Sequence, residues 1–304
     1  MSCYKPIPAV DLGIDPETKK HRVKFLPQRY DDNLAFYRSR YGESLMLMPC
    51  GHCVACAEDY ARTWQCRIMC EAEYYEKGQK ASFLTLTYSG IAPSKPVKSH
   101  LREFIKAVRN HYGSGIKFFG SGELGENTKR SHYHLILFGV NFAEDSQIVS
   151  KRGLNFIYQS KTAEKLWNRG FISIGSLDIA SAGYVSKYCD KKKITGQDEG
   201  EFIIMSRGLG RRYFEEHKKE IFDSDFLYFN GNKFKIPRYF LMLADQDNDV
   251  AIYADDLKSR KKDTAIRFRY DRLKSFTYEE LAMIDAGKLH LQNKVFKEGA
   301  RDVD

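Results

Sequence analysis

The sequence predicts a protein that combines β-strands with α-helices, and three stretches carry this prediction. Lys117–Val140 has two short apolar runs around a polar, glycine-containing connection, which is the pattern of a β-hairpin. Ala81–Tyr88, ASFLTLTY, is rich in β-branched and aromatic residues and predicts another strand. Lys95–Tyr112 repeats apolar residues at helical spacing and stops at Gly113, so it predicts an amphipathic helix.

The composition is that of a globular protein with an anionic partner. Of the 304 residues, 42% are apolar and 29% charged, enough for one large domain or two modest ones. The net charge of +9 favours a polyanion, above all nucleic acid. No segment approaches the ~18 consecutive apolar residues of a membrane span. The N-terminus also lacks a signal-peptide pattern, so a cytoplasmic location is expected.

The first 49 residues carry no recognisable chemistry. Several prolines and few periodic apolar positions predict an arm on the surface that ends in a strand at Ser44–Met48. The prolines are Pro6, Pro8, Pro16 and Pro27.

A cysteine-rich element follows at residues 50–78 and begins with PCGHCVAC. The pattern from Val54 to Lys77 is helical, and seven cysteines in the chain fit reduced thiols or metal ligands better than disulfides. A zinc ion would join the helix start to the preceding loop. The alternative, cytosolic thiols around a helix start, stays open. The candidate zinc ligands are Cys50, Cys53, Cys56 and Cys70, with Cys66 as the alternative to Cys70.

The hairpin at Lys117–Val140 carries a candidate metal site. His132 and His134 alternate with Tyr133 on the second strand, so both imidazoles point to one face. Glu123 ends the first strand, within reach of that face. Two imidazoles and a carboxylate suit a divalent metal that keeps room for phosphate and water. An H-x-H strand buried in the core is the competing interpretation.

The segment Asp178–Lys193, DIASAGYVSKYCDKKK, predicts a helix with two tyrosines on one face. Tyr184 and Tyr188 are four residues apart, and Lys187 lies beside them. A phenol titrates near pKa ~10, and nearby ammonium groups or a divalent metal favour the phenolate nucleophile. A core-facing tyrosine pair with a solvated lysine tail is the alternative. The candidate N-caps are Asp178 and Ser181.

Weaker signals remain in the second half of the chain. A hairpin that turns at Asn230-Gly231 is expected within Asp223–Tyr239. Glu201–Arg212 ends in a glycine-rich basic turn that could contact DNA backbone. Ala254–Ser275 holds eight Lys or Arg against four Asp, which suits phosphate contact and equally suits an ordinary solvated helix. A helix near Thr162–Asn168 and a strand at Phe171–Ile174 are also expected.

These features in combination specify one chemistry, phosphoryl transfer from DNA to tyrosine. The metal would act as Lewis acid on the scissile phosphate. The tyrosine would displace the 3′ oxygen and keep the 5′ phosphate covalently. One phosphodiester replaces another, so the step is reversible without ATP. The chain shows no G-x-x-x-x-G-K-[ST] phosphate loop, hence no sign of an ATP-driven helicase.

The same residues resemble a known family. HYH resembles the histidine motif of the HUH endonucleases, YVSKY with its trailing lysine resembles their two-tyrosine motif, and Glu123 matches the acidic third ligand of rolling-circle initiators. The resemblance is closer still to replication initiators of microviruses, particularly the gokushovirus branch. PCGHCVAC, FLTLTY, GELGENTKRSHYHLILFG, GYVSKYCDKKK and MSRGLG have counterparts there in the same order, over roughly residues 44–240.

The resemblance implies an α+β fold with a central antiparallel sheet flanked by helices. His132 and His134 would lie on a middle strand, and the tyrosine helix would pack opposite. The implied endonuclease domain covers residues 50–240 and includes the cysteine-rich element. The arm at 1–49 and the basic region at 241–304, which could form part of the same domain, lie outside the resemblance.

The resemblance also implies function. The protein would nick one strand at a phage replication origin, form a 5′-phosphotyrosine and leave a 3′-OH for host polymerase. Mg²⁺ or Mn²⁺ would bind Glu123, His132 and His134, the two tyrosines would act as a relay, and Lys187 would stabilise charge. The implied partners are single-stranded and origin DNA with host polymerase and helicase, in the host bacterial cytoplasm, and no membrane.

Three other functions remain as alternatives. The first is a non-enzymatic, zinc-stapled DNA-binding protein, which would lose stability but no catalysis on replacement of His132 or Tyr188. The second is a related relaxase or single-tyrosine transposase, which two tyrosines and the missing helicase motif disfavour. The third is a metal-dependent nuclease that uses water and would survive loss of both tyrosines.

Overall fold

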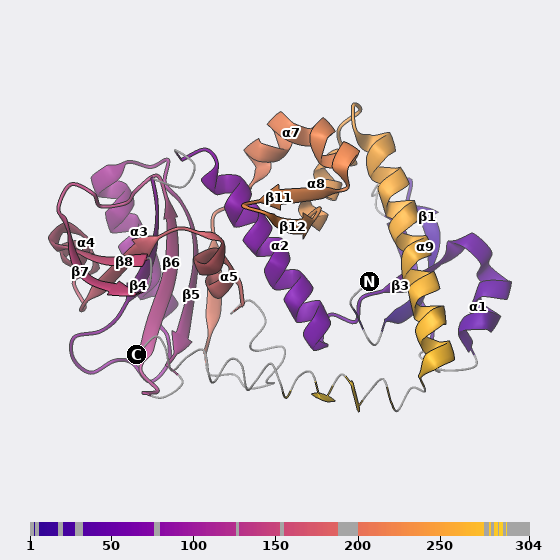
Figure 1. The fold of residues 1–304 in the computed structure, drawn as a ribbon, viewed down its shortest axis with the longest axis horizontal. Coiled ribbons are helices and arrows are strands. Elements are labelled where there is room, and N and C mark those ends of the chain that lie inside the picture. The colour runs from indigo at the N-terminus through magenta and orange to yellow at the C-terminus, as the bar shows by residue number, and fades with distance from the viewer. Residues whose placement is uncertain are drawn as a thin grey trace. The chain divides into compact units, whose positions relative to one another are not determined.

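The chain divides into two compact units in the computed structural model (Figure 1). Residues 60–246 form the central unit, and residues 1–59 with 247–304 form the terminal unit. The structure describes residues 3, 6–17, 21–27, 33–75, 80–125, 128–152, 155–187 and 200–276, together with residues 280, 283, 284, 286, 287 and 290.

A seven-stranded sheet forms the centre of the central unit, and all of its pairings are antiparallel. The strand order is β10-β5-β6-β4-β9-β8-β7, so β6 lies inside the sheet between β5 and β4. The expected α+β class with a central antiparallel sheet is confirmed. The strands are β4 (Ala81–Leu86), β5 (Lys117–Leu124), β6 (Ser131–Phe138), β7 (Ser146–Arg152), β8 (Asn155–Ser160), β9 (Ile172–Ser176) and β10 (Phe202–Met205).

Helices cover both faces of this sheet (Figure 1). On one face, α3 (Lys98–Tyr112) and α4 (Lys161–Trp167) pack on a core that includes Tyr133 and Leu135 of β6. The residues of β6 that alternate with these face the other side. There lie α2 (Val54–Ala72), which begins in the terminal unit, and α5 (Ile179–Lys187).

The α3 helix forms as its apolar spacing predicts. Leu101, Phe104, Ile105 and Val108 are all buried, and Gly113 ends the helix with a φ of 111°. Because a positive φ strains residues that carry a Cβ, glycine suits this C-cap. The helix thereby covers the side of the sheet opposite the histidines.

The central unit ends in a smaller helix and hairpin region. The hairpin between β11 (Phe226–Phe229) and β12 (Asn232–Lys235) turns at Asn230-Gly231, as predicted, and both turn residues have positive φ. Two helices flank it, α7 (Arg211–Ser224) and α8 (Arg238–Ala244).

The terminal unit corrects the prediction of an N-terminal arm. Residues in that range form a three-stranded sheet of order β2-β1-β3 with helix α1, and only the strand near Ser44–Met48 is as expected. The prolines misled because Pro6 precedes β1 and Pro27 follows β2, positions that strands tolerate. The elements are β1 (Ile7–Ile14), β2 (His21–Phe25), α1 (Asn33–Tyr41), the 3₁₀ helix η1 (Gly42–Ser44) and β3 (Leu45–Met48).

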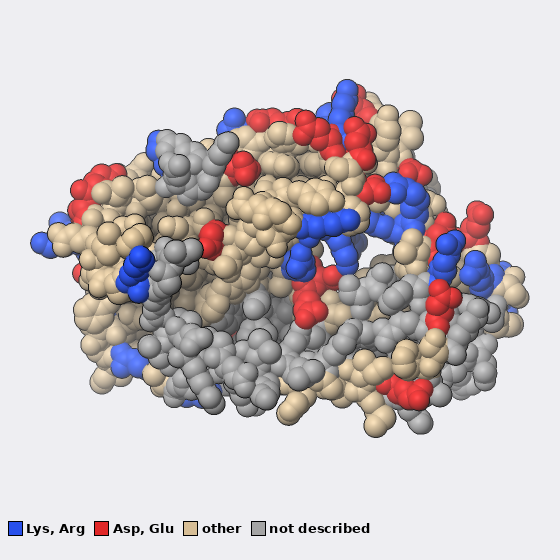
Figure 2. Space-filling view, in the orientation of Figure 1, with Lys and Arg blue, Asp and Glu red and all other residues tan. Residues whose placement is uncertain are grey.

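The basic C-terminal segment forms a long helix, α9 (Ala251–Ser275), which contacts β3. Ile266 packs in a core cluster with Val10 and Leu47 of the small sheet. Its exposed charges pair within the helix, as Arg260 does with Asp256. Figure 2 shows acidic and basic side chains interspersed along α7 and α9. This pattern matches the solvated helix that was the alternative to a DNA-binding stripe.

Among the described helices, none is both long enough and apolar enough to cross a bilayer.

Candidate active site

The register of the β5–β6 hairpin aligns the three candidate metal ligands. Glu123 pairs directly with His132, and Ser121 pairs with His134. Paired residues of antiparallel strands point to the same face, and residues two apart on one strand do so as well. Glu123, His132 and His134 therefore share the face that α5 covers.

The ligand atoms of these three residues converge. Oε1 of Glu123 lies 2.8 Å from Nε2 of His134 and 3.4 Å from Nε2 of His132. One ligand atom from each residue lies within 4.8 Å of the others. Glu123 and His134 are buried, whereas His132 is half-buried at the rim. A divalent ion bound here would thus remain reachable on the His132 side.

The carboxylate of Glu123 is held in its ionised form. Burial by itself would raise its pKa, but the charge of the adjacent His134 outweighs burial and brings the pKa to about 2. Oε1 is buried and, although close to both imidazoles, accepts no hydrogen bond of good geometry from the described residues. A buried, ionised oxygen beside two ring nitrogens is a donor set that fits a divalent metal ion.

His134 is positioned by residues of β4. Thr85 pairs with His134 in the sheet, and its Oγ1 lies 3.2 Å from Nδ1 of the imidazole. When Nδ1 carries the proton, it donates to Oγ1 and leaves the Nε2 lone pair directed at the site. The Phe83 ring stacks on the imidazole at 5.6 Å with an interplanar angle of 6°. Neither Thr85 nor Phe83 was predicted as a site residue, because only strand pairing brings β4 beside β6.

Tyr184 on α5 reaches the same point. Its hydroxyl lies 3.5 Å from Nε2 of His134, and the two rings meet edge to face at 4.9 Å. The ring also meets Phe83 edge to face. The tyrosine hydroxyl is therefore adjacent to the candidate metal ligands.

The start of α5 is fixed by two devices. Asp178 Oδ1 accepts from the Ser181 amide at 2.7 Å, and Ser181 Oγ accepts from the Asp178 amide at 2.8 Å. This reciprocal cap makes Asp178 the N-cap among the two predicted candidates. Gln65 of α2 donates to the Ile179 carbonyl at 2.7 Å. Gly183 permits this approach, since a Cβ there would lie 2.7 Å from Gln65 Nε2.

The other two predicted residues of this motif are less completely described. Lys187 is the last residue of α5, three positions after Tyr184. Tyr188 lies outside the described residues. Their catalytic assignments stay predictions.

Tyr133, the middle residue of the histidine motif, lies on the opposite face of β6 and is fully buried. Its hydroxyl lies 2.7 Å from that of Tyr88 and accepts from the Val97 amide at 3.0 Å. Burial is the main cause that raises the pKa of Tyr88. The hydroxyl of Tyr133 thus fixes the start of α3 to the sheet and lies away from the metal ligands.

The cysteines require a correction. Cys50, Cys53 and Cys56 lie together as predicted, but the fourth member of the cluster is Cys3, not Cys70 or Cys66. Both of these lie farther along α2, and a rise of ~1.5 Å per residue carries Cys70 about 21 Å from Cys56. The predicted helix already contained this limit. No spacing signal singled out Cys3, which precedes the motif by 47 residues.

Comparison with known proteins assigns the segment that carries the site. Residues 81–193 match the family model of the replication-associated protein ORF2. This range contains all the predicted catalytic residues, namely Glu123, His132, His134, Tyr184, Lys187 and Tyr188. No solved structure matches the chain.

Three curated relatives extend the similarity. Replication-associated protein ORF2 of Spiroplasma virus 4 is 29% identical over 294 residues, which cover 90% of this chain and 89% of the relative. Replication-associated protein ORF4 of Chlamydia phage 1 is 27% identical over 68% of this chain and 57% of its own length. Replication-associated protein VP4 of Bdellovibrio phage phiMH2K is 28% identical over 63% and 65%. The expected resemblance to microvirus replication initiators is confirmed by these matches.

Proposed function

We propose that this chain, a relative of phage replication-associated proteins, nicks one strand of DNA at a replication origin and becomes joined to the 5′ end. The observation that carries the proposal is the convergence of Glu123, His132 and His134 with the hydroxyl of Tyr184 on one face of the sheet. Three metal ligands and a phenol at one point suit tyrosine attack on a phosphodiester.

The chemistry is a transesterification in which atoms balance. The phenolate oxygen of Tyr184 forms a bond to phosphorus while the bond to the 3′ oxygen breaks. The phenol proton passes to solvent, and the departing 3′ oxygen takes a proton to become a 3′-OH. A divalent ion held by the two histidines and the carboxylate supplies Lewis-acid stabilisation of the scissile phosphate. The reverse attack reseals the strand without ATP.

The remaining residues receive roles from the resemblance. Tyr188 serves as the second nucleophile, so that one tyrosine holds the 5′ end while the other cuts the regenerated origin. Lys187 stabilises the attacking phenolate or the charge that develops on phosphorus. Mg²⁺ or Mn²⁺ matches a site of one carboxylate and two imidazoles.

The proposed partners follow from charge and chemistry. Single-stranded DNA at the origin is the substrate, and the net charge of +9 favours its approach. The 3′-OH serves host polymerase, with a host helicase to open the duplex. This work would take place in the cytoplasm of the host bacterium.

A covalent-trapping assay tests the proposal. The full chain is mixed with labelled single-stranded DNA that spans candidate origin sequences, with Mn²⁺ or with EDTA, and separated on a denaturing gel. Tyr184→Phe, Tyr188→Phe and the double variant run alongside. Phenylalanine keeps the ring that packs on Phe83 and His134, so only the hydroxyl is lost. The matched control is Tyr228→Phe, an exposed tyrosine on β11.

Three outcomes separate the candidate functions. A Mn²⁺-dependent adduct that disappears in the double variant and persists in Tyr228→Phe supports the proposal. Cleavage without an adduct would indicate a nuclease that uses water. DNA binding with neither cleavage nor adduct, on DNA that holds the origin, would leave a non-enzymatic DNA-binding protein. An adduct that needs only one of the two tyrosines would favour the single-tyrosine relatives.

A further inference from the structure

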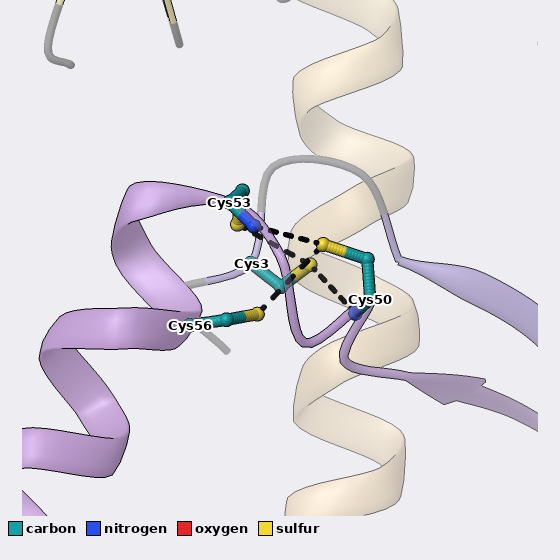
Figure 3. Close-up of side chains that lie close together, drawn as sticks. All are labelled: Cys3, Cys50, Cys53 and Cys56. Carbon is teal, nitrogen blue, oxygen red and sulfur yellow. Dashed lines mark hydrogen bonds between the residues drawn. The ribbon is translucent and has the colours of Figure 1, made fainter. Parts of the chain in front are cut away.

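A second group of metal-ligand side chains lies in the terminal unit and takes no part in the proposed nicking chemistry. One sulfur from each of Cys3, Cys50, Cys53 and Cys56 lies within 4.8 Å of the others. The Sγ atoms of Cys50 and Cys56 are 3.9 Å apart, as are those of Cys53 and Cys3. In Figure 3 the four side chains point toward one another, Cys50 from the chain after β3 and Cys56 from the first turn of α2.

Strand pairing brings the distant cysteine to the other three. β1 and β3 are antiparallel, and Ile7 pairs with Met48. Cys3 precedes β1 and Cys50 follows β3, so the two cysteines leave the sheet at the same end. The pairing therefore closes a 47-residue separation in sequence.

The start of α2 orients the other two thiols. The Cys56 amide donates to the Cys53 carbonyl at 2.9 Å, which forms the first turn of the helix. Residues three apart on a helical turn face the same side. Both sulfurs are thereby directed at Cys3 and Cys50, and Cys3, Cys53 and Cys56 are buried together with Ala55.

Backbone amides point at two of the sulfurs. The Cys53 amide donates to Sγ of Cys50 at 3.4 Å, and the Cys50 amide donates to Sγ of Cys3 at 3.3 Å. Amide hydrogen bonds stabilise the thiolate form, which is the form that binds metal. They also fix the direction of the sulfur lone pairs, as second-sphere contacts do in metal sites.

We propose that this cluster binds one zinc ion in a closed structural site with four thiolate ligands. Zinc–sulfur bonds of ~2.3 Å in a tetrahedron place the sulfurs about 3.8 Å apart, close to the 3.9 Å separations found here. A disulfide requires about 2.05 Å between sulfurs, so the spacing matches an ion and not a bond. Four protein ligands leave no open position for substrate, which assigns a structural role.

The ion would hold together a unit that has little core of its own. A three-stranded sheet with one cluster of buried residues is a small assembly, and assemblies of this size commonly need a metal or a disulfide. Zinc would join the segment before β1, the connection after β3 and the start of α2. Loss of the ion should therefore loosen the terminal unit.

Metal analysis of the purified full chain tests the proposal. The chain is purified without chelator, and zinc is measured per mole of protein by mass spectrometry. We expect about one zinc ion per chain in the parent and at least a fivefold loss in Cys3→Ala and Cys56→Ala. The matched control is Cys66→Ala, a buried cysteine on α2 outside the cluster, which should keep its zinc.

A further arm separates this site from the proposed catalytic site. The His132→Ala/His134→Ala double variant removes two ligands of the catalytic site and should retain one zinc ion. Loss of zinc in this variant would place the ion at the histidines and overturn the proposal. The zinc result does not depend on nicking activity, so either proposal can fail alone.

Cobalt substitution tests the ligands without any variant. Co²⁺ in place of zinc should give the tetrahedral visible spectrum and the near-ultraviolet sulfur-to-cobalt charge-transfer band of thiolate ligation. A spectrum without that band, zinc retention in Cys3→Ala, iron in place of zinc, or a disulfide detected within the cluster would each overturn the assignment.

Discussion

The hydroxyl of Tyr184 lies 3.5 Å from Nε2 of His134, although the two residues are 50 positions apart in the chain. One belongs to helix α5 and the other to an inner strand of the sheet. Their rings meet edge to face with an interplanar angle of 87°. The candidate nucleophile and the candidate metal ligands therefore share one face through packing of α5 on β6.

Replacement of His132 by alanine should weaken Mn²⁺ binding by more than about 100-fold, because removal of a direct ligand should cost at least as much as removal of its support. His132 is only half-buried, so the fold should tolerate the change. Calorimetric titration of Mn²⁺ into the protein without DNA measures the effect. His217→Ala, at an exposed histidine of α7, should leave the affinity unchanged. Equal affinities in the two variants would exclude His132 as a ligand.

Replacement of Thr85 by valine should reduce Mn²⁺ affinity by about 10–100-fold while the sheet stays intact. Valine keeps the shape but removes the oxygen that lies 3.2 Å from Nδ1 of His134, so the ring tautomer is no longer selected. Thr85→Ser restores the oxygen and should recover most of the affinity. If serine and valine behave alike, the hydroxyl does not position the imidazole.

Replacement of Gly183 by alanine should destabilise the central unit and lower nicking. The new Cβ would lie 2.7 Å from Gln65 Nε2, the atom that donates to the Ile179 carbonyl. Overpacking costs about 1–3 kcal/mol, which exceeds the roughly 1 kcal/mol that alanine gains over glycine in a helix. Thermal unfolding monitored by circular dichroism measures the shift. A combined Gln65→Ala change makes room and should relieve part of the loss; a stabilised single variant would contradict the prediction.

Replacement of Tyr133 by phenylalanine should affect stability and spare the chemistry. The hydroxyl accepts from the Val97 amide and contacts Tyr88, so its loss should cost about 1–3 kcal/mol of unfolding free energy. Urea denaturation measures that cost. Adduct formation well below the unfolding transition should match the parent, because the hydroxyl lies on the far face of β6. A loss of adduct in folded protein would assign Tyr133 a catalytic part.

Much of the fold and of the site follows from local pattern. The β5–β6 hairpin, the strand β4 and the apolar face of α3 follow from alternation and helical spacing, which depend on neighbouring residues alone. The alternation His132-Tyr133-His134 also predicts that Tyr133 turns away from the imidazoles, as it does. Strands β7 and β8 were not predicted, because their polar and charged residues are held by pairing with neighbours and not by a distinct pattern.

The sequence by itself determined the types of chemistry: two histidines and a carboxylate on one hairpin, a tyrosine pair on a helix, and a cysteine triplet at a helix start. The tertiary structure decided which distant residues complete these groups. Thr85 reaches His134 only because β4 pairs with β6, and Cys3 reaches Cys50 only because β1 pairs with β3. Pairing between strands far apart in sequence leaves no local periodicity, so no pattern along the chain reports it.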